Sequence, residues 1–483
     1  MSNKLLLSII FVSFVVSVCT LRGGHEWGDD FASYIMQAES IVNGNTQEFV
    51  EHNSFTIFNS SFQIGPVAYP WGYPLILAPV YALKGVSPLS LKIPGLLFFA
   101  GFLLCLYYGL MGTNLTYVER LLLVALFAFN PILIKFLNQI LSDVPFLFFS
   151  TLALLLMVRK NKNTYDHILL GGVISLAFFI RTAGILLLVS YLAFEFFGGW
   201  SNRKNREAYK TVLQRVFMVC GVFGLLWITY ALVFPGGGES YFAQYRPLQI
   251  EEILGFSNSY FHLFSLFFGE TTLWNNLYYV LIIFFLIGLW TRRKEETIFI
   301  IFLFLWIILL ISWPYWQGLR FIFPLLPIFI YFTFQGMKTV ISKMPERLHL
   351  ISQRVFLIFW LIIICVFLFN SSANAYLNLQ NNQTAGGPFD PYSMQMYDYI
   401  KEKTPPDSII VFFKPRAMRL MTVRDAIMLA ECDRLLTGDY VVLSRNKKIA
   451  ENHQIQPNEI VACNLPLEEV FKNRKFVTYK ILK

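Results

Sequence analysis

The apolar segment LLLSIIFVSFVVSVCTL, from Leu5 to Leu21, is followed closely by the polar stretch Glu26-Trp27-Gly28-Asp29-Asp30. A helix of this length can cross about 30 Å of hydrocarbon. A charge at the bilayer centre costs about 2.5–3.5 kcal/mol even on lenient insertion scales, so working carboxylates belong near the water boundary. The stretch therefore predicts a membrane-spanning helix with two aspartates at its outer mouth.

Similar apolar runs recur along the chain to about residue 372. The 483 residues are 56% hydrophobic and 14% charged, whereas a soluble globular protein has about 45–50% apolar residues. From the runs long enough to cross a bilayer we expect about eleven spans. The sequence therefore predicts an α-helical polytopic membrane protein, with its membrane region over residues 1–373.

The basic residues predict the orientation of this region. They cluster in short loops, namely Arg159-Lys160-Asn161-Lys162, Arg203 to Arg215, Arg292-Arg293-Lys294 and Lys338 to Arg354. These are alternate loops, which is the positive-inside pattern and places them in the cytoplasm together with the N-terminus. The long loops 22–71 and 235–273 then face outward. Because the net charge of +9 is divided among short loops, we expect no nucleic-acid partner.

The first apolar segment also has the charged start and apolar core of a signal peptide. Val18 is too large, however, for a lipobox position before Cys19. Removal of the segment would also leave an even number of spans and set the later loops against the positive-inside pattern. We therefore expect the segment to be retained.

Residues 374–483 are polar and predict a small soluble α/β domain on the outer face. The expected elements are a helix over Ser393 to Lys403 and strands over Ser408 to Phe413, Tyr440 to Leu443 and Phe476 to Ile481. Cys432 and Cys463 lie in this domain, where an oxidising compartment would permit a disulfide. We expect the other four cysteines to be packing residues.

Three further charged residues are expected at the level of the first two acids. Asp143 heads the fourth span, Arg181 lies in an apolar outer turn, and Arg320 heads the tenth span. Helix capping alone would explain Asp143, and snorkelling to the lipid headgroups would explain Arg181.

The two long outer loops hold further candidates. Residues 31–43 have the pattern of an amphipathic helix, which we expect to lie along the membrane surface. The stretch from Gly65 to Pro74 is rich in proline and aromatic residues and cannot be one continuous helix. Candidate chamber residues of the second loop are Tyr241, Tyr245, Arg246 and His262, although ordinary loop surface is the preferred explanation for each of them taken singly.

This set of residues suits transfer of a sugar from a lipid phosphate to a hydroxyl. A carboxylate can take the proton of the attacking hydroxyl as a general base. The departing phosphate needs cations, and arginine supplies a permanent charge with a planar fork of donors. One displacement of this kind would invert the anomeric centre.

Several separated motifs resemble the GT-C glycosyltransferases, within them the protein O-mannosyltransferase and lipid A aminoarabinose-transferase branch and its bacterial members. The resemblance covers most of the membrane region in order. The motifs are Gly28-Asp29-Asp30 with Tyr34, Tyr69-Pro70-Trp71-Gly72-Tyr73-Pro74, Leu141-Ser142-Asp143-Val144-Pro145, Phe179-Ile180-Arg181, Arg320-Phe321-Ile322-Phe323-Pro324 and the C-terminal Phe412-Phe413-Lys414-Pro415-Arg416.

The resemblance implies a polyprenyl-phosphate-linked sugar donor, a hydroxyl acceptor on a lipid, glycan or protein, and a site on the outer face of a bacterial inner membrane. It implies that Asp29 is the general base, with Asp30 in reserve, and that Asp143 positions the acceptor or shapes the site. The expected cations near the donor phosphate are Arg181, Arg320, Lys414 and Arg416, and the expected chamber residues are Tyr69, Tyr73, Tyr245 and Arg246.

Alternatives to this interpretation stay open. Some related enzymes bind a divalent metal, but His25 and Glu26 alone make a poor metal site, so we expect no metal cofactor. A transporter or flippase of lipid-linked glycans is the rival from another class, although we see no paired repeat and no polar site at mid-membrane. A polysaccharide polymerase or ligase is the closer enzymatic rival, and a structural scaffold is a further alternative.

Overall fold

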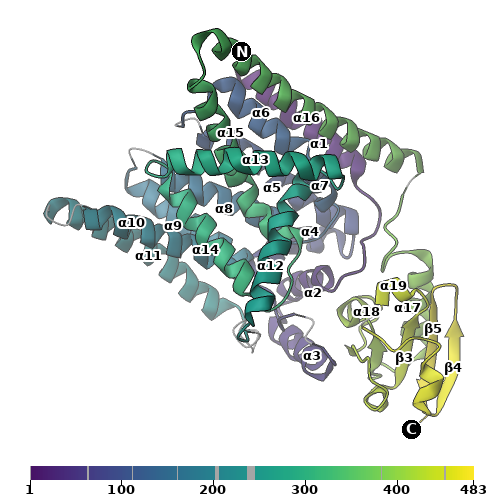
Figure 1. Cartoon of the computed structure of the whole chain (residues 1–483). Helices are drawn as coiled ribbons and strands as arrows, with labels where there is room; N and C mark the ends of the chain where they lie inside the picture. The colour runs from purple at the N-terminus through teal and green to yellow at the C-terminus, as the bar shows by residue number, and fades with distance from the viewer. Residues whose placement is uncertain are drawn as a thin grey trace.

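A computed structural model describes residues 2–62, 65–110, 113–159, 162–201, 206–236, 245–381, 383–450 and 453–482. Most of the chain is a bundle of apolar helices, and a small α/β domain lies at one corner of it (Figure 1). The apolar helices are α1 (Ser2–Thr20), α5 (Pro88–Gly109), α6 (Tyr117–Ala128), α7 (Pro131–Phe136), α8 (Asp143–Val158), α9 (Thr164–Ile180), α10 (Ile185–Ser201), α11 (Arg206–Val233), α13 (Thr272–Arg292), α14 (Thr297–Ser312), α15 (Leu326–Ser342) and α16 (Glu346–Asn381).

These helices confirm a polytopic helical membrane protein. In the described part of the chain, six helices are long and apolar enough to cross a membrane by length and composition, and four shorter apolar helices accompany them. The predicted number of eleven spans stays a prediction. The third predicted span, about residues 117–136, is interrupted between α6 and α7. The side chain of Asn130 caps α7 there by accepting from the N–H groups of Ile132 and Leu133.

Three more helices lie in the two long loops, namely α2 (Asp30–Asn43), α3 (Thr46–Asn59) and α12 (Ile250–Leu263), and α4 (Gly72–Lys84) directly follows the first loop. The predicted amphipathic helix is α2, and its expected position along the membrane surface stays a prediction. Every residue from Phe31 to Ala38 is buried, on all sides of the helix. It packs against α3, α4 and the soluble domain, so protein rather than solvent covers it.

The soluble domain is built on a five-stranded sheet of order β2-β1-β3-β5-β4. The strands are β1 (Ile410–Phe412), β2 (Ala426–Ile427), β3 (Tyr440–Ser444), β4 (Leu467–Lys472) and β5 (Phe476–Ile481), and the helices are α17 (Pro391–Lys403), α18 (Pro415–Thr422) and α19 (Lys447–Ala450). β1 runs parallel to β2 and β3, whereas β5 runs antiparallel to β3 and β4. The three predicted strands and the predicted helix are confirmed, and so is the disulfide between Cys432 and Cys463.

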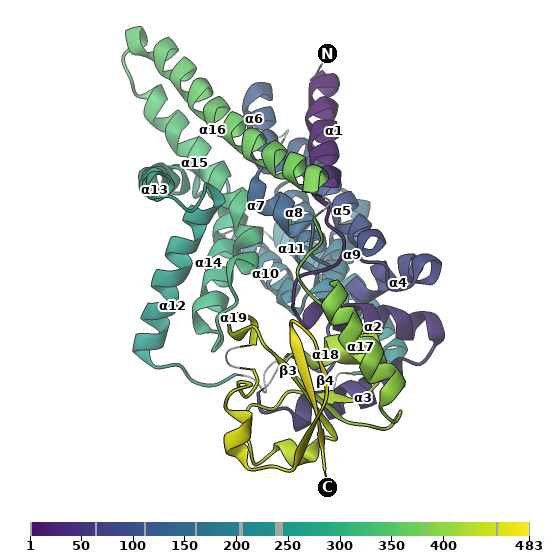
Figure 2. The same cartoon turned by 90° about the vertical axis from the view of Figure 1, so that its right-hand side faces the viewer.

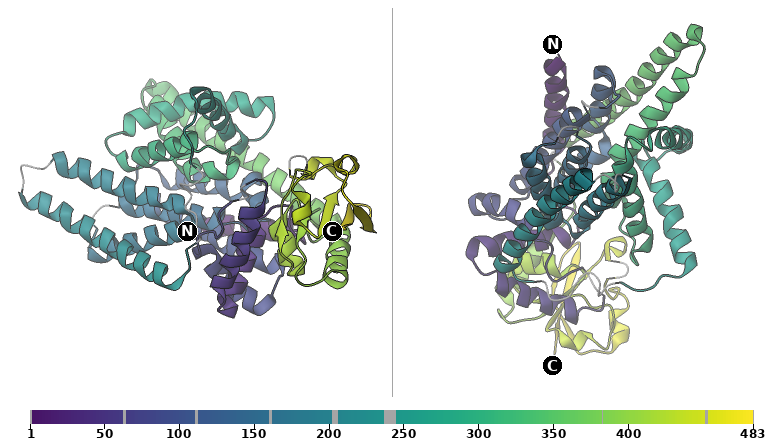
Figure 3. Two further views of the ribbon diagram at one scale, coloured as in Figure 1. Left: turned by 90° about the horizontal axis from the view of Figure 1, so that it is seen from below. Right: turned by 90° about the vertical axis from the view of Figure 1, so that its left-hand side faces the viewer.

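The soluble domain lies at the end of the bundle opposite the start of α1 (Figure 2). Helix α16 runs beside α1 and continues through residue 373 to Asn381, so the last membrane helix leads directly into the domain. Helices α10 and α11 extend on the side away from the domain (Figure 3). The soluble domain and the first long loop, with α2 and α3, thus share the end of the bundle opposite the N-terminus (Figure 2).

The domain docks on the first outer loop through aromatic and backbone contacts. The ring of Trp27 lies 5.0 Å from that of Phe413 and 5.9 Å from that of Phe412. At the other edge, the N–H of Ser61 donates to the carbonyl of Met428 at 2.8 Å. The acid-bearing segment is therefore held between the bundle and the domain.

Candidate functional site

The turn that follows α1 is fixed by three polar side chains, two from the helices α5 and α16 and one from the turn after α7. Lys92, Asn138 and Asn378 donate hydrogen bonds of 2.8–2.9 Å to backbone carbonyls between Cys19 and Gly24. The last carbonyls of a helix have no partner within the helix, so these donors satisfy them. We refer to these three side chains as the collar. They set the direction in which the chain leaves the bundle toward Asp29 and Asp30.

Asp30 is the first residue of α2 and accepts two strong hydrogen bonds. The Tyr69 hydroxyl donates to Oδ1 at 2.6 Å, and Nη1 of Arg320 donates to Oδ2 at 2.8 Å. Burial opposes ionisation of this carboxyl, but the charge of Arg320 and the two hydrogen bonds outweigh it and lower the pKa of Asp30. Asp30 is therefore an ionised, anchored carboxylate.

Asp143 and Arg181 form a buried ion pair beside Asp30. Nη1 of Arg181 lies 2.5 Å from Oδ1 of Asp143, and Nη1 of Arg320 lies 3.9 Å from Oδ2 of Asp143. Asp143 begins α8, and Arg181 ends α9 with its guanidinium 4.3 Å from the centre of the Phe321 ring. Arg181, in the apolar turn, is thus paired with Asp143 and lies over the Phe321 ring. Arg320 lies between Asp30 and Asp143.

Asp29 has a different environment from its neighbour Asp30. It is 7% exposed, and its Oδ1 has no hydrogen-bond partner in the part of the chain that the structure describes. Burial raises the pKa of Asp29, whereas the charges of Lys414 and Arg416 and the backbone N–H of Ala417 lower it and fall short of the effect of burial. Of the two adjacent acids, Asp29 is therefore the one poised to take up a proton.

The two cations from the soluble domain occupy different positions. Arg416 is fully buried; it donates to the carbonyl of Pro66, and its guanidinium lies 5.4 Å from the centre of the Tyr69 ring. Lys414 precedes α18 and is partly exposed, and its side chain makes no hydrogen bond or ion pair within the described ranges. Arg416 therefore supports the tyrosine that holds Asp30, and Lys414 is left with its donors available.

The candidate chamber residues fall into two groups. Tyr69 and Tyr73 join the cluster, because their rings lie 4.8 and 4.9 Å from that of Tyr34, whose hydroxyl shares a 3.0 Å hydrogen bond with Ser142. The candidates described in the second outer loop do not join it. Tyr245 is exposed, Arg246 is paired with Glu252 at 2.6 Å, His262 bonds Tyr279, and Tyr241 lies outside the described residues.

Both ring nitrogens of His25 form hydrogen bonds within the protein, so neither is available to a ligand. Its Nδ1 donates to the carbonyl of Glu26 at 2.7 Å, and its Nε2 accepts from the N–H of Ile140 at 3.0 Å. Burial lowers the pKa of His25 to about 4, so the ring is neutral. Across the described ranges, no three His, Cys, Asp or Glu side chains converge on one point that could hold a metal ion. Independence of a metal stays a prediction.

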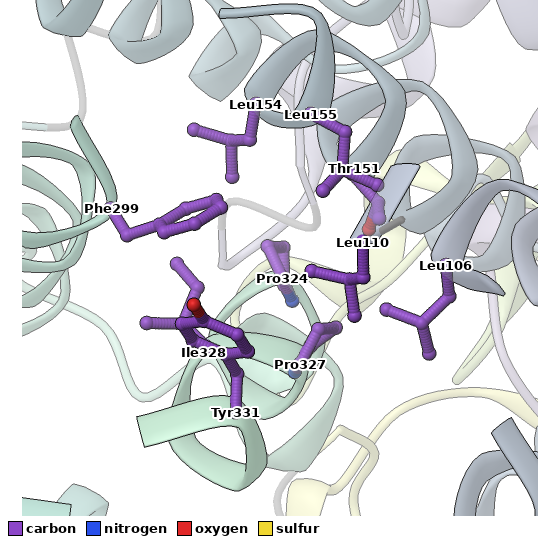
Figure 4. Close-up of a pocket in the computed structure, with 10 residues that line it drawn as sticks. All are labelled: Leu106, Leu110, Thr151, Leu154, Leu155, Phe299, Pro324, Pro327, Ile328 and Tyr331. Atoms are coloured by element: carbon purple, nitrogen blue, oxygen red, sulfur yellow. The ribbon is translucent and has the colours of Figure 1, made fainter. Parts of the chain in front are cut away.

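A small apolar cavity lies inside the bundle, away from the charged cluster (Figure 4). Its volume is about 20 Å³, and it is lined by Leu106, Leu110, Thr151, Leu154, Leu155, Phe299, Pro324, Pro327, Ile328 and Tyr331. The Tyr331 hydroxyl is already bonded to Glu296 at 2.9 Å. The cavity therefore offers packing space but no reacting group.

Sequence reasoning missed several residues that shape the site. Ser142, Lys92 and Tyr397 carry no local signal of their own, since a serine, a lysine at a span boundary and a tyrosine in a soluble segment are ordinary. Only the contacts with Tyr34, with the turn after α1 and with the surroundings of Asp29 reveal them.

The fold is that of a membrane protein of the GT-C class, in which a cluster of charged residues lies beside a small α/β domain. No protein-family model matches the sequence, and no curated protein matches it either. The fold follows from solved structures. That of ArnT from Cupriavidus metallidurans in the apo state matches over 99% of this chain and 98% of its own, with a TM-score of 0.60 and 12% identity.

Two further structures agree. ArnT from the same organism bound to undecaprenyl phosphate has a TM-score of 0.56 at 12% identity over 99% of this chain and 98% of its own. The archaeal oligosaccharyltransferase AglB from Archaeoglobus fulgidus, in complex with an inhibitory peptide and a dolichol-phosphate, has a TM-score of 0.58 at 12% identity over 99% of this chain and 74% of its own. The similarity thus extends over almost the whole chain, including the soluble domain.

Proposed function

We propose that this protein is an integral membrane glycosyltransferase that transfers a sugar from a polyprenyl-phosphate-linked donor to an acceptor hydroxyl on the extracytoplasmic face. The observation that carries the proposal is the convergence of Asp30, Asp143, Arg181 and Arg320, which come from four separate parts of the chain. Asp29 directly precedes Asp30 in the chain. An unused set of buried charges would be costly in a membrane protein.

The donor class is supported by the solved structures of similar fold. One ArnT structure contains undecaprenyl phosphate, and one AglB structure contains a dolichol-phosphate. Both ligands are long isoprenoid chains that end in a phosphate. We infer the same class of donor lipid for this chain. We infer that it transfers a single sugar, and transfer of a sugar polymer becomes the interpretation only if single-sugar donors fail.

The chemistry divides between the two neighbouring acids. Asp29 takes the proton of the acceptor hydroxyl as its oxygen attacks the anomeric carbon, and the bond from that carbon to the phosphate oxygen breaks on the opposite face. The anomeric centre is inverted, and the lipid phosphate leaves as an anion. Asp30 cannot readily take this proton, because Tyr69 and Arg320 hold it ionised.

The leaving phosphate needs cations that are not already fully engaged. Lys414 has its donors available, and Arg320 is bonded to Asp30 through one nitrogen at 2.8 Å and keeps 28% of its side chain exposed. We assign Lys414 and Arg320 to the donor phosphate and Arg181 to the positioning of Asp143. Arg416 is buried and acts on the site through Tyr69 instead.

The test uses purified full-length protein in nanodiscs with a panel of polyprenyl-phosphate monosaccharides. We expect one donor to be turned over, and Asp29→Asn to abolish turnover while leaving the fold intact. Asp398→Asn, at an exposed position on α17, is the matched control and should behave as wild type. If no donor is turned over while a lipid-linked glycan crosses proteoliposomes, the transferase proposal falls and the flippase alternative replaces it.

A further inference from the structure

The soluble domain contributes a hydroxyl to the surroundings of Asp29. We propose that Tyr397 is a positioning residue for Asp29, donating a hydrogen bond from its hydroxyl to the Asp29 carboxylate when that carboxylate is ionised. The catalytic meaning of this contact rests on the proposed function, but the contact itself does not. It would make the soluble domain part of the reacting site rather than an appended module.

Tyr397 lies on the buried face of α17, where it is 1% exposed. Its ring lies 6.4 Å from the ring of Phe412, and that ring lies 5.9 Å from the ring of Trp27. Because Trp27 precedes Asp29 by two residues, this aromatic chain brings α17 to the acid-bearing turn. The tyrosine therefore reaches the interface between the soluble domain and the first outer loop.

Two polar atoms at this interface lack partners among the described residues. They are the hydroxyl oxygen of Tyr397 and Oδ1 of Asp29, and both are buried. A buried donor or acceptor without a partner is unfavourable, and native structures rarely keep one without a reason. One group is an O–H donor and the other is a carboxylate acceptor, so each can satisfy the other.

The charges around the tyrosine identify its partner. Asp29 is the strongest charge that acts on Tyr397, and Asp390 is the next. Asp390 is already engaged, because it accepts from the N–H groups of Tyr392 and Ser393, from the Ser393 hydroxyl, and from Lys475 at 2.9 Å. Asp29 is therefore the acid that has room for the hydroxyl.

The contact leaves Asp29 able to react. A carboxylate has about four acceptor positions, so hydrogen bonds from Tyr397 and from the N–H of Ala417 still leave room for the acceptor hydroxyl. The groups that face Asp29 are Lys414 from the residue before α18, Arg416 from α18, Asp30 from α2 and Tyr397 from α17. Loss of the tyrosine hydroxyl removes a donor that favours the ionised form, so the carboxylate becomes harder to ionise.

The test compares Tyr397→Phe with wild type in full-length protein in nanodiscs, and infrared spectroscopy follows the protonated Asp29 carboxyl as the pH is varied. The band of Asp29 is the one that disappears in Asp29→Asn. We expect its titration midpoint to move to higher pH in Tyr397→Phe by about one pH unit. The acid limb of the transfer activity should move with it. Because the substitution removes a single oxygen atom from the ring, the Tm should stay near that of wild type.

Tyr399→Phe is the matched control, because Tyr399 lies on the same helix but stacks on Phe471 at 4.8 Å instead of facing Asp29. Its titration midpoint should equal that of wild type. The inference is overturned if Tyr397→Phe titrates as wild type, or if both variants shift equally. If wild type transfers no sugar from any donor while the infrared midpoint of Tyr397→Phe still shifts, the proposed function falls and the positioning contact stands.

Discussion

Arg320 donates to Asp30 at 2.8 Å, although 290 positions of sequence separate them. The same nitrogen lies 3.9 Å from Asp143, whose other oxygen is held by Arg181 at 2.5 Å. One guanidinium is thus shared between two carboxylates, so the cluster depends on the register between the first outer loop and the start of the tenth predicted span. A negatively charged donor entering the cluster has to share this guanidinium with both acids.

A double-mutant cycle with Asp30→Asn and Arg320→Gln measures this pairing. Because both side chains are about three-quarters buried, at 28% and 24% exposed, we expect a coupling of about 1–3 kcal/mol in the free energy of unfolding. The cycle is measured by chemical denaturation in detergent. The matched control is the exposed pair of Arg246 and Glu252 at 2.6 Å, whose coupling should be close to zero because water screens it. Equal coupling in the two cycles would contradict the buried pairing.

The pH dependence of transfer should respond to Lys414. Burial raises the pKa of Asp29, and the charge of Lys414 opposes that rise. The general base works only when ionised, so activity falls as the pH drops through this pKa. In Lys414→Met the pKa of Asp29 rises further, and we expect the acid limb of the activity profile to move to higher pH.

Two variants accompany this measurement. Lys414→Arg keeps the charge and should restore the midpoint of the acid limb to that of wild type. Lys403→Met removes an exposed charge at the end of α17 and should leave the midpoint unchanged. A Lys414→Met profile that is lower at every pH but keeps the wild-type midpoint would show that Lys414 binds the donor without acting on Asp29.

Gly72 permits a close contact that holds Arg181 in place. A Cβ atom at Gly72 would lie 2.5 Å from the carbonyl oxygen of Phe179, two residues before Arg181. We expect Gly72→Ala to push the end of α9 away from α4, to destabilise the protein by about 1–3 kcal/mol and to lower the transfer rate. The measurement is the Tm in detergent together with single-turnover transfer.

Gly95→Ala is the control for this substitution. Gly95 lies within α5, and a Cβ atom there would meet nothing within 4 Å. Its Tm should equal or slightly exceed that of wild type, since alanine is the better helix former. If Gly72→Ala keeps the wild-type Tm and rate, the close approach of α4 and α9 is not needed for the site.

The disulfide between Cys432 and Cys463 tests both stability and orientation. It joins residues 31 positions apart, so its removal should cost about 3–4 kcal/mol through the entropy of the unfolded loop. Cys432→Ser/Cys463→Ser should therefore unfold at lower denaturant than wild type, and reduction of the wild type should reproduce the shift. An unchanged midpoint would show that the domain is stabilised by its sheet alone.

The same cysteines report the side of the membrane. Cys432→Ser leaves Cys463 as a partly exposed thiol. In right-side-out vesicles we expect a membrane-impermeant maleimide to label this variant, and the double variant to show no such label. Labelling only after the vesicles are opened would reverse the predicted topology.

The sequence predicted the helices and strands that its local pattern encodes. Long apolar runs indicate membrane helices, because backbone N–H and C=O groups in hydrocarbon must all be hydrogen-bonded within the protein. Runs of β-branched and aromatic residues indicate β1, β3 and β5. β4 was not predicted, because LEEVFK is a polar, mostly exposed edge strand. The two residues of β2 are too few to show any period.

The site was predicted as a set of charges at one level of the membrane, and Asp30, Asp143, Arg181 and Arg320 do meet. Their pairing could not be predicted, because it depends on how far each helix tilts and rotates. Arg416 shows the same limit. A basic residue in a soluble segment is expected to be exposed, yet Arg416 is fully buried against a loop 350 positions earlier in the chain. Tyr245 and Arg246 were chosen for residue type alone, and no local pattern could place them outside the cluster.

The collar that fixes the turn after α1 has a consequence for biosynthesis. The donors that hold residues 19–24 are Lys92, Asn138 and Asn378, and Asn378 lies in the last turns of α16. The first helix to enter the membrane thus acquires its final outer geometry only after the last one has been inserted. The two aspartates are synthesised early, but the turn that leads to them is fixed only when α16 is in place, so a chain whose α16 has not yet been inserted carries no assembled site.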